Sequence, residues 1–440
     1  MNAQCRLGAA TLKRLRLSRG WSLAGTARAI LAAADDLGQT VGTSVASVQR
    51  SVARWESAKP TLPGDRYQLL LAHLYGRDTT GEYSLGPGSD FTELMDALAR
   101  LGAGSIQLDQ LRALMVRLAT DAGGGFVLLG PAIRPLITQA MTNPSSVSEV
   151  LLEGLDGTVA TVDAQIGSVP FVRLRILLDP VVHACDRLIG TGAQREHCRL
   201  SSVAARAYTL AARLAFETRD DTAAHALYEA ATRSAAHLPK WRRSVVHMSR
   251  ALVSLYSSSG PAVASRLIEA AVRDARAGES GLTRARAHAL QAEMAARAGL
   301  DRPTRTALSL AWYDTDRDHS GDPSASSFSA DHLRGFEGVC QLFVGEPTAA
   351  HDYFEGAAAA LRAPREQVQR TIVTTDQALA RIRMNAPREA ADLLHGCIDT
   401  ADSTGSRVAR LRLRIAREGL RPWHSESWVR DLDDHMISAM

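Results

Sequence analysis

The segment from residue 47 to residue 56 combines side chains that can read DNA bases with a spacing that exposes them together. Its sequence is Ser-Val-Gln-Arg-Ser-Val-Ala-Arg-Trp-Glu. One helical face carries the apolar residues Val45, Val48, Val52 and Trp55. The opposite face carries Gln49, Arg50 and Arg54. Gln can bond bidentately to adenine and Arg to guanine in the major groove, which is wide enough for a helix. Taken alone, the stretch also fits an ordinary amphipathic helix with a solvated polar face.

The flanking sequence predicts further short helices. Leucines alternate with basic residues from Leu12 to Arg19, and Gly20 follows, which predicts a helix ended by glycine. Ser22 is a suitable N-cap for a second helix. After Trp55, two prolines end the helix, and the apolar run 66–76 predicts a closing helix. Residues 8–77 are thus expected to form four or five short helices.

These residues resemble the helix-turn-helix of the lambda-repressor-like, xenobiotic-response-element family of bacterial regulators. The triplet Arg54-Trp55-Glu56, the turn from Ala58 to Pro63 and the leucine-rich run ending at Gly76 match that family's pattern. The resemblance implies base contacts by Gln49, Arg50 and Arg54 and a phosphate contact by Ser22. The predicted DNA-binding set is Ser22, Ser47, Gln49, Arg50, Arg54 and Lys59.

The sequence departs from the family pattern in the turn before the recognition helix. Residues 31–44 stand where the family has a tight turn, so either the second helix is longer or the turn is a loop. Ala58 replaces the family's glycine, and Leu23 stands where a polar contact residue is common. These differences make the register of Gln49 less certain than that of Arg54.

Charge favours nucleic-acid binding by the N-terminal segment without reference to a family. Residues 1–80 hold eleven Lys or Arg against five acids, a balance of +6, whereas the whole chain is only +4 and the other 360 residues therefore sum to −2. Lys and Arg supply most non-specific affinity for DNA by neutralising phosphates. A basic segment on a slightly acidic body is the charge distribution of a DNA-binding head.

Length and composition predict an all-α protein with several domains. A chain of 440 residues exceeds one typical domain, and its abundant alanine favours helix. The N-terminus resembles no secretory leader, and polar residues interrupt every apolar run, so we expect a cytoplasmic protein without membrane contact. Five widely spaced cysteines predict reduced thiols. The expected domains are 1–77, a connecting region 78–172, and a helical repeat 173–440.

The connecting region contains Gly123-Gly124-Gly125, which invites comparison with a phosphate-binding loop. No Gly-Lys-Ser/Thr follows, and no strand-helix framework surrounds the glycines. We therefore interpret residues 121–131 as a turn or connector.

From residue 173 the chain reads as a succession of helix pairs. Five similar segments, expected as the second helices of pairs, are 222–231, 261–271, 303–311, 347–357 and 387–397. Longer helices are expected before each of them, near 202–217, 241–257, 283–298, 330–344 and 366–383. Successive proline starts lie 42, 44 and 40 residues apart. Small residues recur where close helix approach is expected, at Ala230, Ala270, Gly356 and Gly396.

This succession resembles a degenerate tetratricopeptide-type array, which implies an α-solenoid. Residues 313–329 interrupt it with a polar stretch. We interpret that stretch as a surface insertion, with a ligand-gating loop as the alternative. Trp423 and Trp428 are expected to cap the last repeat or to pack at a dimer contact.

The combination resembles bacterial regulators in which a helical repeat senses a peptide or small-molecule effector and holds two DNA-binding heads in a homodimer. The partner of the heads would be a double-stranded DNA operator. Candidate effector-binding residues are polar positions on the first helices: Arg206, Arg213, His247, Arg250, Arg284, Arg286, Gln291 and Arg370. A solvated face is the alternative for each of them. A protein-interaction scaffold with a vestigial helix-turn-helix is the alternative for the whole chain, with an enzyme in third place.

Motifs for catalysis or metal binding are weak. The sequence has no Gly-x-Ser-x-Gly, His-Glu-x-x-His or Cys-x-x-Cys. His183, Cys185, His197 and Cys198 are zinc-ligand types, but their spacing matches no zinc module, and two buried thiols with incidental histidines are the alternative. We expect no enzymatic activity, no cofactor and no metal.

Overall fold

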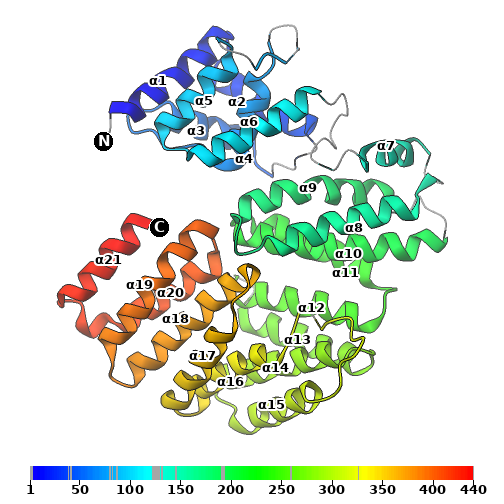
Figure 1. The fold of residues 1–440 in the computed structure, drawn as a ribbon, viewed down its shortest axis with the longest axis vertical. Helices are drawn as coiled ribbons and strands as arrows, with labels where there is room; N and C mark the ends of the chain where they lie inside the picture. The colour runs from blue at the N-terminus through cyan, green and yellow to red at the C-terminus, as the bar shows by residue number, and fades with distance from the viewer. Residues whose placement is uncertain are drawn as a thin grey trace. The chain divides into compact units, whose positions relative to one another are not determined.

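The apolar spacing of the sequence produces helices throughout the computed structural model (Figure 1), as the all-α prediction requires. The structure describes residues 3–439 except 38, 40, 41, 79, 80, 82, 86, 87, 121–128, 130, 131, 144, 145, 190–193, 258, 259 and 326. Within the described residues, extended pairing is limited to isolated bridges between Arg77 and Tyr83 and between Ile166 and Val169. The triple glycine at 123–125 lies outside the described residues.

The chain divides into two compact units. The first comprises residues 1–154 with 176–191, and the second comprises residues 155–175 with 192–440. The domain boundaries expected at 77 and 172 stay predictions. Among the described helices, none has both the length and the apolar character needed to cross a lipid bilayer.

The first unit is built from helices, of which α2, α3 and α5 begin at a serine N-cap. Its helices are α1 Ala3–Ser18, α2 Leu23–Asp36, α3 Val45–Trp55, α4 Asp65–Tyr75, α5 Asp90–Leu101, α6 Ser105–Thr120, α7 Arg134–Thr142, the beginning of α8 Glu149–Ala164 and most of α9 Phe171–Leu188. Both α8 and α9 cross the division between the units. Gly20 follows α1 with a φ of +68°, where glycine has no steric cost. Ser22 caps α2, as predicted, by accepting a hydrogen bond from the Gly25 amide. α2 reaches Asp36, and the described residues 37, 39 and 42–44 are not helical, so helix and loop share the stretch 31–44.

Packing in the first unit places α3 against α2, and α4 against α2, α5 and α6, while α1 packs on α5. The core contains fully buried apolar side chains from the first four helices, including Leu15, Ile30, Val48 and Leu70. Burying each such side chain contributes on the order of 2 kcal/mol. The core therefore fixes the orientation of α3.

The second unit is a succession of packed helix pairs. Its remaining helices are α10 Gln194–Glu217, α11 Asp221–Ala235, α12 Lys240–Leu255, α13 Gly260–Arg276, α14 Gly281–Arg297, α15 Asp301–Thr315, α16 Ala330–Val344, α17 Pro347–Ala360, the 3-10 turn η3 Pro364–Glu366, α18 Gln367–Arg383, α19 Pro387–Thr404, α20 Arg407–Gly419, the 3-10 turn η4 Arg421–Trp423 and α21 Ser427–Ala439. Each even-numbered helix from α10 to α18 packs on the next one, and neighbouring even-numbered helices also touch. The predicted helix positions in this region are confirmed.

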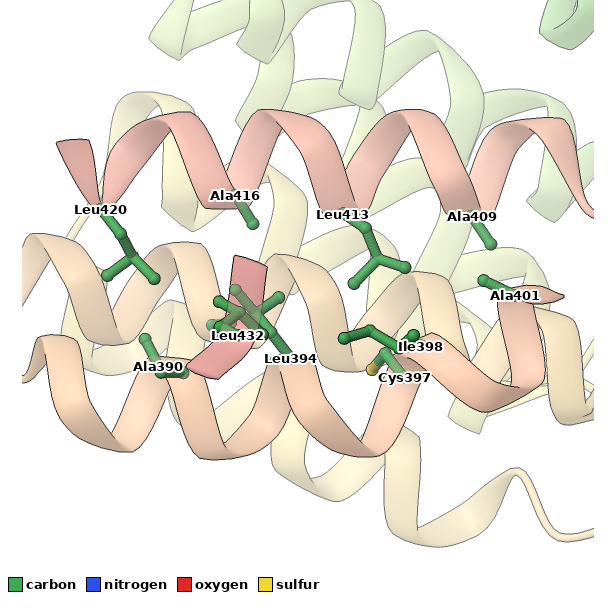
Figure 2. Close-up of a cluster of buried hydrophobic side chains, with 12 residues drawn as sticks. Ala390, Leu394, Cys397, Ile398, Ala401, Ala409, Leu413, Ala416, Leu420 and Leu432 are labelled. Carbon is green, nitrogen blue, oxygen red and sulfur yellow. The ribbon is translucent and has the colours of Figure 1, made fainter. Parts of the chain in front are cut away.

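The last helices form a core of small and branched apolar side chains (Figure 2). Leu394 and Ile398 from α19 meet Leu413 from α20, and Leu432 from α21 joins them. Trp423 and Trp428 pack against the same core, partly buried. Their expected roles, as a cap on the last repeat or at a dimer contact, stay predictions.

The small residues that allow close packing lie one position later than predicted. Gly356 and Gly396 are exposed, and a Cβ at either would meet open space, so the prediction for these glycines was wrong. The buried small side chains of the second helices are instead Ala231, Ala271, Ala357 and Cys397. The physical reason is the register of the helix: the apolar stripe passes through these positions, and the glycines lie beside it.

Two side chains of the stretch 313–329, Asp322 and Ser324, bind the start of α14. The Asp322 carboxylate accepts hydrogen bonds from the Ser280 hydroxyl at 2.7 Å and the Leu282 amide at 3.1 Å, at the N-terminus of α14. Thr283 and Ser324 pair through their hydroxyls at 2.7 Å in a buried position. Half of the described residues of this stretch are exposed, as expected of a surface insertion, and the capping of α14 by Asp322 was not predicted.

Candidate functional site

α3 has one buried face and one solvent face. Val48, Val52 and Trp55 are buried, as predicted, whereas Val45 is only half-buried. Ser44 caps the helix by accepting a hydrogen bond from the Ser47 amide at 3.3 Å. The apolar stripe sets which side chains of α3 face water.

The end of α3 is fixed by aromatic and ionic contacts. The centroid of the Trp55 ring lies 5.1 Å from that of the Tyr67 ring. This contact packs the end of α3 against the first turn of α4. The Glu56 carboxylate at the C-cap of α3 is bound by the buried Arg16 guanidinium of α1. That pairing was not predicted, because Arg16 was counted only as one of the basic residues. A rigid C-terminus gives α3 a defined orientation.

The solvent face of α3 carries the predicted base-reading residues. Arg50 and Arg54 are exposed, and Gln49 and Ser47 are half-buried. The Arg54 guanidinium makes a hydrogen bond of 3.3 Å to the Ser51 hydroxyl of the same helix. Lys59 follows α3 and is exposed. In the described part of the chain, none of these cations meets a carboxylate.

Ser22 marks the N-terminus of α2. Its hydroxyl oxygen accepts a hydrogen bond of 3.0 Å from the Gly25 amide, which leaves the hydroxyl proton free to donate. Ser22 is exposed. A helix N-terminus carries a partial positive charge from its unpaired amides, so an anion such as a phosphate is favoured beside it.

The eleven cations of residues 1–80 fall into two groups. Five arginines are paired with carboxylates of the same unit: Arg14 with Glu93, Arg16 with Glu56, Arg19 with Asp90, Arg66 with Asp179 and Arg77 with Asp36. Six others have no such partner among the described residues: Arg6, Lys13, Arg28, Arg50, Arg54 and Lys59. The second group includes every cation of the predicted DNA-binding set.

Three of the predicted effector-binding arginines are already paired within the second unit. Arg206 pairs with Asp156, Arg250 with Glu229 at 2.5 Å, and Arg284 with Asp314 at 2.8 Å. Hydrogen bonding to the Asp314 carboxylate raises the pKa of Arg284. Each pair connects two helices, so the three arginines contribute to helix packing within the fold.

The other predicted effector residues differ in their surroundings. Gln291 bonds through Oε1 to Nδ1 of His288 at 3.1 Å. Arg213 and Arg286 are half-buried, and Arg370 is exposed; within the described residues these three make no ion pair. Burial, with the charges of Arg213 and Arg365, lowers the pKa of Arg286 to about 10. His247 lies 3.7 Å from Asp274 through Nε2.

Zinc-ligand types do not assemble in the described part of the chain, where no group of three or more His, Cys, Asp or Glu could hold a metal ion. Cys185 is completely buried, and burial raises the pKa of its thiol to about 12. Cys198 is exposed. The His197 side chain lies outside the described residues.

No protein-family model matches this chain, and no curated protein or solved structure matches it either. The function is therefore argued from its own residues.

Proposed function

We propose that this chain is a sequence-specific DNA-binding transcriptional regulator, with residues 3–77 as a helix-turn-helix head. α3 would be the recognition helix. The observation that carries the proposal is the solvent face of α3, which presents Gln49, Arg50 and Arg54 opposite the buried apolar face. Among the described residues, neither arginine forms an ion pair with a carboxylate. Side chains of these types match the hydrogen-bonding edges of adenine and guanine.

The distribution of ion pairs in the head supports this assignment. An arginine that serves the fold is expected to have a carboxylate partner, as Arg16 and Arg19 do. Exposed cations without a partner repel one another, and DNA phosphates relieve that repulsion while releasing counterions. Lys59 and Ser22 would hold phosphates on either side of α3, and Ser47 would contact the backbone near the start of α3.

For the second unit we propose an α-solenoid of tetratricopeptide-like pairs that receives a peptide or small-molecule effector and holds the chain as a homodimer. The succession of packed pairs from α10 to α19 supports this architecture, because a single pair cannot bury its apolar face without stacked neighbours. Two heads in a dimer would bind half-sites about one helical turn apart, roughly 34–36 Å. An effector that changed their separation would change operator affinity.

Selection of binding sites from random duplexes with the full chain tests the proposal. The selected sequences are expected to contain two related half-sites. The double variant Arg50→Ala and Arg54→Ala should bind the selected duplex about 100-fold more weakly, because each lost bidentate contact costs roughly 1–3 kcal/mol. Lys59→Ala should instead weaken binding to all duplexes and lower the salt dependence by about one counterion.

The matched control is Arg302→Ala, which removes an exposed arginine of α15. Its affinity should equal that of the wild type. Recovery of no preferred sequence, together with equal weak binding by the wild type and the double variant, would refute the proposal and leave the interaction scaffold as the better account.

A further inference from the structure

A cavity of about 370 Å³ lies in the second unit, among α11, α12 and α13. Small apolar side chains form part of its wall, including Ala235 and Val246. Polar side chains form the rest: Thr232, Arg243, His247, Arg273 and Asp274. The volume falls in the range of about 300–1,000 Å³ that small-molecule sites occupy.

Two of the lining side chains keep buried nitrogen atoms without a hydrogen-bond partner. Arg243 and His247 are four residues apart on α12 and therefore lie on the same helical face. The Nε atom of Arg243 and the Nδ1 atom of His247 are both buried and unpaired. A buried polar atom without a partner is unfavourable, so a ligand that hydrogen-bonded to these atoms would bind more tightly.

Asp274 holds these groups in place. Its Oδ1 atom accepts a hydrogen bond of 2.5 Å from Nη2 of Arg243, and its Oδ2 atom lies 3.7 Å from Nε2 of His247. Asp274 therefore balances one positive charge. It also orients the two α12 side chains from the neighbouring helix α13.

A positive charge remains at the cavity after that pairing. Arg273, next to Asp274 on α13, is exposed and has no carboxylate partner among the described residues. Burial lowers the pKa of His247, which favours the uncharged ring. The lining thus carries two arginines against one carboxylate and a net charge of +1.

We propose that this cavity binds a small organic anion with one acidic head group and an apolar body. Arg273 would meet the acidic group, and the free nitrogens of Arg243 and His247 would meet its hydrogen-bonding atoms. The alanine and valine wall would cover the apolar body. The binding itself is independent of DNA, whereas its role as the effector site rests on the proposed regulatory function.

Fluorescence titration of the full chain with 1-anilinonaphthalene-8-sulfonate tests the site, because this probe combines an anionic group with an apolar body. Arg273→Ala should weaken probe binding about tenfold, the loss expected for one charge-assisted hydrogen bond. Arg276→Ala is the matched control, since Arg276 is an exposed arginine of the same helix outside the cavity lining, and it should leave probe affinity unchanged. The uncharged analogue N-phenyl-1-naphthylamine should bind at least tenfold more weakly than the sulfonate.

A second variant fills the cavity without removing charge. Ala270→Phe places a ring where Ala270 lines the cavity, and it should abolish saturable probe binding while circular dichroism stays unchanged. Competition then distinguishes the acidic groups: displacement by benzoate indicates a carboxylate ligand, and displacement by phenyl phosphate indicates a phosphate ligand. Displacement by neither overturns the proposal, as does equal probe affinity of the wild type and Arg273→Ala. Because no DNA is present, this failure is distinct from a failure of the proposed function.

Discussion

The guanidinium of Arg16 forms a bidentate ion pair with the carboxylate of Glu56. Nε of Arg16 lies 2.8 Å from Oε1 of Glu56, and Nη2 lies 2.7 Å from Oε2. Nη1 donates a further hydrogen bond of 2.8 Å to the carbonyl oxygen of Trp21. The two side chains are only 9% and 7% exposed. One buried pair therefore connects the end of α1, the turn before α2 and the C-cap of α3.

Removing one partner of this pair should destabilise the first unit. Arg16→Met leaves the Glu56 carboxylate buried without its counter-charge, which costs about 3–5 kcal/mol. The double variant Arg16→Met with Glu56→Gln should recover part of that loss, since no isolated charge remains. Urea-dependent hydrogen exchange of the amides of α1 to α4 measures the free energy of opening.

The exposed pair of Arg14 and Glu93 is the matched control. Arg14 is 61% exposed, so water screens the interaction and Arg14→Met should cost at most about 1 kcal/mol. Equal losses for Arg16→Met and Arg14→Met would show that the buried pair does not hold α3.

The pH dependence of the first unit should reflect His73. Its ring is 3% exposed, and Oη of Tyr83 lies 3.1 Å from its Nδ1. Burial, assisted by the charge of Arg77, lowers the pKa of His73 to about 4. The unfolded chain takes up a proton near pH 6.5 and the folded chain only near pH 4, so stability is full above pH 6.5 and falls as the pH drops between these values.

Thermal denaturation at pH 4.5 and at pH 7.5 measures this effect. The loss between these two values should be smaller in His73→Asn than in the wild type by roughly 2–3 kcal/mol, because each unit of pKa shift corresponds to about 1.4 kcal/mol. His225→Asn removes an exposed histidine of α11 and should keep the wild-type dependence. An unchanged pH dependence in His73→Asn contradicts the assignment.

Helix positions could be predicted because they depend on local signals. Ser22 and Gly20 mark helix ends through their own backbone preferences, and the period of Val48, Val52 and Trp55 marks a buried face. These signals lie within a few residues of one another, so one sequence suffices to read them. The succession of helix pairs in the second unit was found in the same way.

Pairings between distant residues could not be predicted. Arg16 and Glu56 are 40 residues apart, and nothing in the local sequence distinguishes Arg16 from the exposed Arg14. In the candidate cavity, His247 was predicted as an effector residue, but Arg273 and Asp274 were missed because they belong to the neighbouring helix. The one available signal was Arg243, four residues before His247 on the same helical face.

The stretch 313–329, which was predicted as a surface insertion, gives a further test through Asp322. The Asp322 carboxylate also accepts a hydrogen bond of 2.8 Å from the Ser324 amide, so one side chain joins the loop to the N-terminus of α14. Burial opposes ionisation, but these hydrogen bonds keep the pKa of Asp322 below its ordinary value.

Asp322→Ala should release the loop, and trypsin should then cleave after Arg317 at least tenfold faster than in the wild type. Asp318→Ala removes an exposed carboxylate of the same loop, whose hydrogen bonds go to His319 and Ser320 within the loop, and should leave the cleavage rate unchanged. Equal cleavage of the wild type and Asp322→Ala would mean that the loop opens independently of this cap.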